Sequence, residues 1–302
     1  MTAGVSSSPR IAFPLSVFLQ HDAQDAALPA GMGLQAKIFA DAVQQVCSFL
    51  LHAPSGRALL RAAVLRGVHI GLDPLLEPQT SFYYPLQKRL DIGYQPSSLL
   101  SSQKGISLYL ASIIGGLRRI WQHSRALTPD TRLKPEDFLR YCRAFEADVC
   151  AITHLAAWEL RAAGPCFFWR HLLAAADGDV SVSFARTAAA HPRHQFDGTA
   201  LRAAFLEWFE VAERVDACDH LALEMMDMAL LGARGAAQDI GRMKLDTARL
   251  CQLGVMPQGG NYLGGMRFRA PQMRRGCDPF NRTHLKHIER DICYLSENQE
   301  SF

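Results

Sequence analysis

The histidines and cysteines of this chain can be tested directly against the spacings of known metal sites. Eight cysteines lie between positions 47 and 293, and no two of them have the CxxC spacing of a structural zinc site. Scattered cysteines in a chain this long are typical of buried thiols in a reducing compartment. His191 and His194 lie three residues apart, as do His284 and His287. Because a metal site needs three or four converging ligands, neither pair is predicted to bind a metal.

The elements that would position reactive residues follow from composition and apolar spacing. Hydrophobic residues make up 49% of the 302 residues and charged residues 20%, which is typical of a globular protein with its own core. The net charge of +3 is too small to imply a polyanionic partner by itself. Residues 1–33 are predicted to form a loose arm, and residues 34–302 a single domain.

Helical periodicity dominates the chain and predicts an α+β fold that is mostly helical. Three short strands, at 68–72, 81–84 and 89–94, are predicted to form a small antiparallel β-meander. Residues 177–197 are predicted to be an exposed loop with a short strand at 180–184. Helices are predicted at about 34–51, 55–66, 103–123, 135–163, 165–176, 199–214, 218–243 and 281–295. If Gly232 and Gly235 break the helix at 218–243, residues 239–253 form a separate helix.

Two adjacent glycines, Gly115 and Gly116, lie in the middle of the helix predicted at 103–123. Each costs about 1 kcal/mol of helix stability relative to alanine. The simplest reason for keeping them is close packing of this helix against a neighbouring strand or helix.

Short motifs recur along the chain in a fixed order. They are Pro54-Ser55-Gly56-Arg57, Leu59-Leu60, Asp73-Pro74, Phe82-Tyr83-Tyr84-Pro85, Leu117-Arg118, Trp121-Gln122, Glu146-Ala147-Asp148, Trp158-Glu159-Leu160, Leu253-Gly254, Pro257 and Asn261-Tyr262-Leu263. This order resembles a bacterial family of unknown function that is described as a putative metallopeptidase family. The resemblance covers roughly residues 50–295 and implies a zincin-like domain of the gluzincin type, with a sheet, a motif helix and a second helix that bears a carboxylate.

The chain departs from this family at the residues that handle zinc. The family motif is His-Glu-x-x-His, in which two histidines one turn apart bind zinc and the glutamate acts as general base. Gly115 stands at the first histidine, Gly116 at the glutamate and Arg119 at the second histidine, whereas Glu146 matches the third ligand. Because catalytic zinc takes three protein ligands and a water, the resemblance implies the fold and argues against the activity.

Arg119 and Glu146 are expected to converge where the metal would lie. We hypothesise that the guanidinium replaces the lost cation and pairs with the carboxylate, which would otherwise be costly to bury. The alternative is that both are ordinary surface charges. His123, Asp148 and His154 are candidates for the rim of this site, although the histidines would equally suit core positions.

The sequence therefore predicts a pseudoenzyme, a catalytically inactive metallopeptidase-like protein with a binding or regulatory role. It would need no cofactor and would bind an unknown protein or peptide, for example as an added strand at the sheet edge. One alternative is an active metal-dependent hydrolase, with zinc at a rearranged site of His123, His154 and Glu146. Another is a nucleic-acid-binding protein that uses segment 264–290, which has seven basic residues and two acidic ones.

A cytoplasmic protein without membrane contact is the prediction for location. No apolar run reaches the length of a membrane-spanning helix. Residues 11–19 resemble the apolar part of a signal peptide, but Pro14 interrupts them and His21 and Asp22 follow at once.

Overall fold

A four-stranded sheet lies in the first of two compact units of the chain. The computed structural model describes residues 12–19, 33–77, 79–96, 102–232, 239–266, 268, 273 and 276–297. One unit consists of Met1–Arg125 and Ile152–Gly178, and the other of Ala126–Ala151 and Asp179–Phe302. Each unit is described by itself, and a single domain from residue 34 onward stays a prediction.

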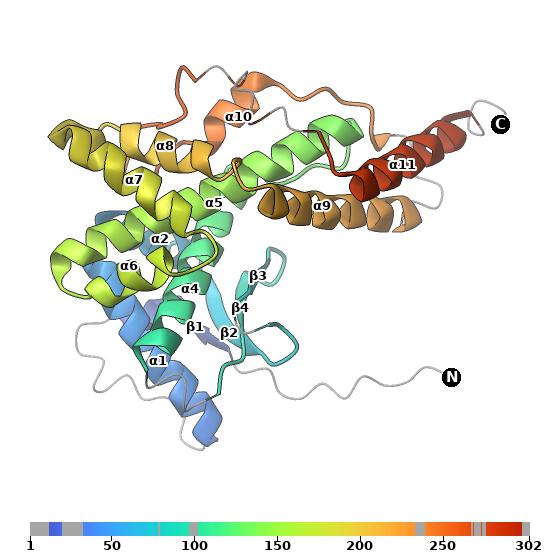
Figure 1. Cartoon of the computed structure of the whole chain (residues 1–302). Coiled ribbons are helices and arrows are strands. Elements are labelled where there is room, and N and C mark those ends of the chain that lie inside the picture. The colour runs from blue at the N-terminus through green and yellow to red at the C-terminus, as the bar shows by residue number, and fades with distance from the viewer. Residues whose placement is uncertain are drawn as a thin grey trace. The chain divides into compact units, whose positions relative to one another are not determined.

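The sheet has the strand order β1-β2-β4-β3 and is mixed (Figure 1). Its strands are β1 (Ala12–Pro14), β2 (His69–Asp73), β3 (Ser81–Tyr84) and β4 (Arg89–Gly93). The three predicted strands are present, but the prediction of a purely antiparallel meander is wrong, because β2 and β4 pair in parallel with Gly71 opposite Asp91. In the β3–β4 hairpin, the buried strand β4 lies next to β2, and β3 lies at the edge of the sheet. Local turn signals predict the hairpin but not which of its strands faces β2.

Part of the segment that was expected to form a loose arm belongs to this unit. β1 pairs antiparallel with β2, and the 3₁₀ helix η1 (Leu15–Leu19) buries Leu15 and Phe18. The Phe13 ring stacks on Phe39 at 6.4 Å between centroids. Apolar contacts therefore order residues 12–19, whereas the remainder of 1–32 lies outside the described residues.

Helix α4 (Gln103–His123) is the central helix of the first unit. Ser102 caps it by accepting a hydrogen bond from the Gly105 amide at 3.1 Å. It packs on β3 and β4 and against α1 (Leu34–His52), α2 (Pro54–Val64) and α6 (Cys166–Leu173). The C-terminal part of α5 (Pro135–Ala163) completes this unit.

The second unit is helical in its described residues. It holds the N-terminal part of α5, α7 (Gly178–Ala190), η2 (Pro192–Gln195), α8 (Thr199–Glu207), α9 (Ala212–Gly232), α10 (Thr247–Leu253) and α11 (Pro279–Glu297). Helices α9 and α11 lie side by side (Figure 1). The predicted loop at 177–197 with a strand at 180–184 is wrong, because Val180, Phe184 and Ala188 are buried at helical spacing in α7.

The predicted α+β class with mostly helical content is confirmed. None of the helices in the described part of the chain combines the length and the apolar character that a bilayer crossing requires.

Candidate functional site

Gly116 allows α4 to approach the central strand β4 closely. A Cβ atom at Gly116 would lie 2.5 Å from Leu90 Cδ1 and 2.8 Å from Leu90 Cδ2, and Leu90 is fully buried. Such distances are far below van der Waals contact, so any larger residue would displace Leu90. The expected close packing against a strand is confirmed for Gly116, and the Leu90 side chain occupies the space into which a larger side chain at this position would project.

The neighbouring positions offer no metal donor either. Gly115 is buried on α4, and Arg119 is half-buried one turn later. A glycine has no side-chain ligand atom, and a guanidinium carries positive charge and cannot be deprotonated in a protein. Glu146 is half-buried on α5. It belongs to the second unit and Arg119 to the first, so their pairing stays a prediction.

Two residues predicted for the site rim take part in packing and hydrogen bonding. The half-buried His123 ring lies edge-on to Tyr83 at 5.5 Å between centroids. Asp148 is fully buried and accepts a hydrogen bond of 2.6 Å from the Tyr262 hydroxyl. This bond joins two of the sequence motifs, which are more than a hundred residues apart.

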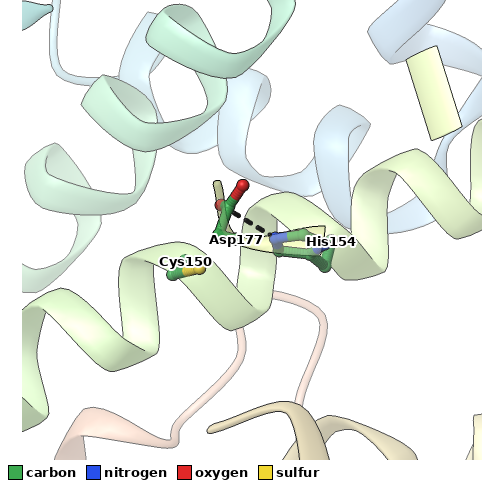
Figure 2. Close-up of side chains that lie close together, drawn as sticks. All are labelled: Cys150, His154 and Asp177. Atoms are coloured by element: carbon green, nitrogen blue, oxygen red, sulfur yellow. Dashed lines mark hydrogen bonds and ion pairs between the residues drawn. The ribbon is translucent and has the colours of Figure 1, made fainter. Parts of the chain in front are cut away.

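His154, the third predicted rim residue, belongs to a cluster of metal-ligand type. Figure 2 shows Cys150 and His154 one turn apart on α5, with Asp177 beside them. One ligand atom from each residue lies within 4.8 Å of the other two, and His154 Nε2 is 3.1 Å from Asp177 Oδ2. Among the described residues, no other three His, Cys, Asp or Glu side chains meet this way.

The cluster runs from the interior towards solvent. The His154 side chain is fully buried, Cys150 is half-buried, and the Asp177 side chain is 33% exposed. Sequence reasoning named His154 but missed Cys150 and Asp177. The i, i+4 spacing of Cys150 and His154 on a predicted helix was an available signal. Asp177 could not be predicted as a third member, because it lies in the turn after α6 and the sequence does not specify the path of that turn.

A further motif pair has a structural role in the first unit. The Glu159 carboxylate accepts hydrogen bonds from Ser55 at the start of α2, at 2.8 Å from the amide and 2.6 Å from the hydroxyl. A carboxylate there satisfies one backbone amide that the start of a helix leaves unpaired. Burial raises the pKa of Glu159, and the bonds from Ser55 act in the opposite direction.

Charged pairs also stabilise the second unit. Arg143 forms a buried ion pair with Asp219, with Arg143 Nε 2.6 Å from Asp219 Oδ1. One histidine of each pair binds a partner outside the pair: His194 Nδ1 lies 3.0 Å from the Thr187 carbonyl oxygen, and His284 Nε2 lies 2.5 Å from Asp227 Oδ2 on α9.

The buried cysteines are poor nucleophiles. Burial raises the pKa of the Cys47 thiol to about 12 and that of Cys142 well above its usual value. A thiol with such a pKa stays protonated at neutral pH, where the thiolate would be the reactive species. These two cysteines therefore fit the predicted role of buried apolar residues.

Comparison with known proteins gives one family. Residues 21–263 match the family described as a putative metallopeptidase family (DUF6782). The match covers most of the chain, and the chain belongs to this family. No curated protein and no solved structure matches it. The motif residues from Pro54 to Leu263 lie inside the matched range, whereas the basic segment 264–290 lies beyond it.

Proposed function

We propose that this chain is a catalytically inactive member of the family, a zincin-like pseudoenzyme that binds a protein or peptide. The observation that carries the proposal is the contact between Gly116 and Leu90. A zinc peptidase needs a carboxylate beside the metal-bound water, and here that position lacks both the group and the room for it.

The α4 segment also fails as a place for the zinc that the family description implies. Gly115 and Gly116 provide no donor atom, and Arg119 would repel a dication. Glu146 alone cannot provide the three protein ligands that catalytic zinc takes. The proposed function therefore needs no cofactor, and no reaction step is assigned to this segment.

The proposed binding surface is the edge strand β3, which among the described strands pairs with β4 alone. Phe82 is 53% exposed, and its ring lies 4.7 Å from that of Tyr84, two residues further along the strand. The Arg89 guanidinium carbon lies 5.3 Å from the centroid of Tyr84. An extended peptide could add main-chain hydrogen bonds at such an edge and place an apolar side chain on these rings.

The first experiment measures hydrolysis. Purified full-length chain would be incubated with zinc and a library of quenched peptides and of unfolded protein substrates, followed by mass spectrometry. We expect no cleavage above that of a zinc-only blank. Zinc-dependent cleavage that is lost in Glu146→Gln or His154→Ala would overturn the proposal in favour of the alternative hydrolase with a rearranged site.

The second experiment measures binding with a library of extended peptides. Phe82→Glu should weaken the selected peptides by roughly tenfold or more, since loss of an apolar anchor is commonly worth more than 1 kcal/mol. Leu86→Glu is the matched control, because Leu86 is also exposed but lies in the turn after β3. Equal losses in both variants would exclude β3 as the binding edge.

The nucleic-acid alternative depends largely on residues whose placement is not described. Arg267, Arg269, Arg274 and Arg275 lie outside the described residues. Within the described part, Arg282 and Lys286 of α11 line a cavity of about 380 Å³ together with Arg140, Arg143, Glu136 and Glu289. Salt-sensitive retention on DNA that is lost in Arg274→Ser/Arg275→Ser would favour this alternative.

A further inference from the structure

We propose that Cys150, His154 and Asp177 bind one Zn²⁺ ion. The proposal does not depend on the pseudoenzyme function, because none of the three residues belongs to the degenerate motif of α4. It identifies a metal site in a place that the family's motifs do not predict.

The backbone places the three donors close together. One turn of α5 separates Cys150 from His154, so their side chains lie on one face of the helix. Asp177 reaches this face from the turn between α6 and α7, immediately before Gly178. A helical pair with a third ligand from a distant turn is a common way to assemble a zinc site.

The distances fit a tetrahedral ion after a small adjustment. With zinc bonds of about 2.3 Å to sulfur and about 2.0–2.2 Å to nitrogen and oxygen, the ligand atoms of a tetrahedral site lie roughly 3.3–3.8 Å apart. His154 Nε2 and Asp177 Oδ2 are already 3.1 Å apart, and all three ligand atoms lie within 4.8 Å of one another. The largest correction is thus about 1 Å, which rotation of the Cys150 or Asp177 side chain can supply.

The donor set selects the metal. One thiolate, one imidazole and one carboxylate suit zinc, whereas magnesium and calcium prefer oxygen ligands alone and copper(I) prefers sulfur. Binding replaces the thiol proton by the metal, so Cys–SH and Zn²⁺ give Cys–S–Zn and one proton is released to solvent. The exposed side of Asp177 provides a route of entry, and water would complete the coordination.

The test is a zinc titration of the full-length chain after removal of metal with a chelator, against a competing chromophoric chelator. We expect one tightly bound zinc per chain. Asp177→Asn and Cys150→Ser should each weaken binding by on the order of 100-fold, because even loss of a residue outside the coordination shell commonly costs 10- to 100-fold. Cys293→Ser, at an exposed cysteine of α11, is the matched control and should bind zinc as the parent does.

Asp177→Asn is the most informative variant, because Asp177 is partly exposed and the amide has the same shape as the carboxylate. His154→Ala is less suitable, because it would leave a cavity at a buried position and could destabilise the fold. Far-ultraviolet circular dichroism would establish that each variant is folded. Zinc should also raise the Tm of the parent and of Cys293→Ser, but not that of Asp177→Asn. Equal zinc affinity in the parent, Asp177→Asn and Cys150→Ser would overturn the site, as would a folded parent that binds no zinc.

The two proposals fail in different ways. Zinc binding without peptide cleavage agrees with both of them. Zinc-dependent cleavage that is lost in Asp177→Asn would retain the metal site and overturn the inactive function. If the chain neither binds zinc nor cleaves peptides, the metal site is overturned and the proposal of an inactive function is retained.

Discussion

Helix α4 and the cluster of Cys150, His154 and Asp177 differ in what each provides for a metal site. The α4 segment lies in a chain of a putative metallopeptidase family, but Gly115, Gly116 and Arg119 offer no metal-ligand atom, and Leu90 occupies the space beside Gly116. The α5 cluster has sulfur, nitrogen and oxygen donors close together, but it matches no motif. The order of motifs thus indicates the fold, whereas metal chemistry depends on which donor atoms meet.

The contacts of the motif residues explain this difference. Ser55 binds Glu159, Tyr262 binds Asp148, and Gly116 packs on Leu90. Each contact joins segments far apart in the sequence and stabilises one unit. Under the proposed function, the chain retains these motifs because they stabilise its fold, although the zinc-binding residues have been replaced.

The largest expected effect comes from placing a glutamate at Gly116, where we propose that a general base has been lost. Gly116→Glu would overpack α4 against β4 and bury a carboxyl group, and should lower the free energy of unfolding by roughly 4 kcal/mol. Urea denaturation measures this loss. Gly33→Glu is the control, because a Cβ at Gly33 meets no atom within 4 Å, and it should change stability little. A Gly116→Glu variant as stable as the parent would show that Leu90 does not block a side chain at position 116.

A double-mutant cycle between Gly116 and Leu90 tests the same contact more sharply. Leu90→Ala should cost about 3 kcal/mol, because it empties a fully buried position. Gly116→Ala should destabilise the parent by about 1 kcal/mol, since overpacking exceeds the gain in helix propensity. In the Leu90→Ala background the same change should be neutral or stabilising. Additive effects in the cycle would mean that the two residues do not interact.

The hydrogen bond between Tyr262 and Asp148 tests whether a motif residue of α5 serves the fold. Tyr262→Phe should cost about 2 kcal/mol, because it leaves a buried carboxylate without this donor. Tyr84→Phe, which keeps the ring beside Arg89, should cost much less. The difference between the two variants in thermal denaturation measures the effect, and equal stabilities would contradict a structural role for this pair.

The smallest effect is the pH dependence that Glu159 contributes. Because burial raises the pKa of Glu159 in the folded chain, its contribution to stability is fully present below the unfolded pKa and is lost as pH rises through the folded pKa. The free energy of unfolding of the parent should therefore fall relative to that of Glu159→Gln as the pH rises above about 4.3, the ordinary pKa of a glutamate. A parent that instead gains stability relative to Glu159→Gln as the pH rises above about 4.3 would contradict the assignment.

Local periodicity predicted the helices well where their apolar stripes were broad, as in α4 and α5. It failed for α7, whose glycine, serine and aspartate content resembles a loop although Val180 and Phe184 are buried on one face. It also could not predict that β2 pairs with β4, because strand order depends on which edge the hairpin presents. Residues close in sequence were thus easier to place than pairings between distant segments.

The same limit applies to the candidate sites. The proposed loss of the zinc motif rests on Gly115, Gly116 and Arg119, whose identities can be read directly from the sequence. That Leu90 occupies the space beside Gly116 requires knowledge of how β4 packs on α4. Cys150 and His154 could have been paired from their helical spacing, but Asp177 joins them through tertiary structure alone.

The most direct test of this contrast between α4 and α5 is zinc X-ray absorption spectroscopy on the zinc-loaded full-length chain. If the α5 cluster holds the metal, the spectrum should show one sulfur ligand at about 2.3 Å and nitrogen or oxygen ligands at about 2.0–2.2 Å. The sulfur contribution should disappear in Cys150→Ser and persist in Cys293→Ser. A spectrum of the parent with nitrogen and oxygen ligands alone, unchanged in Cys150→Ser, would contradict the account.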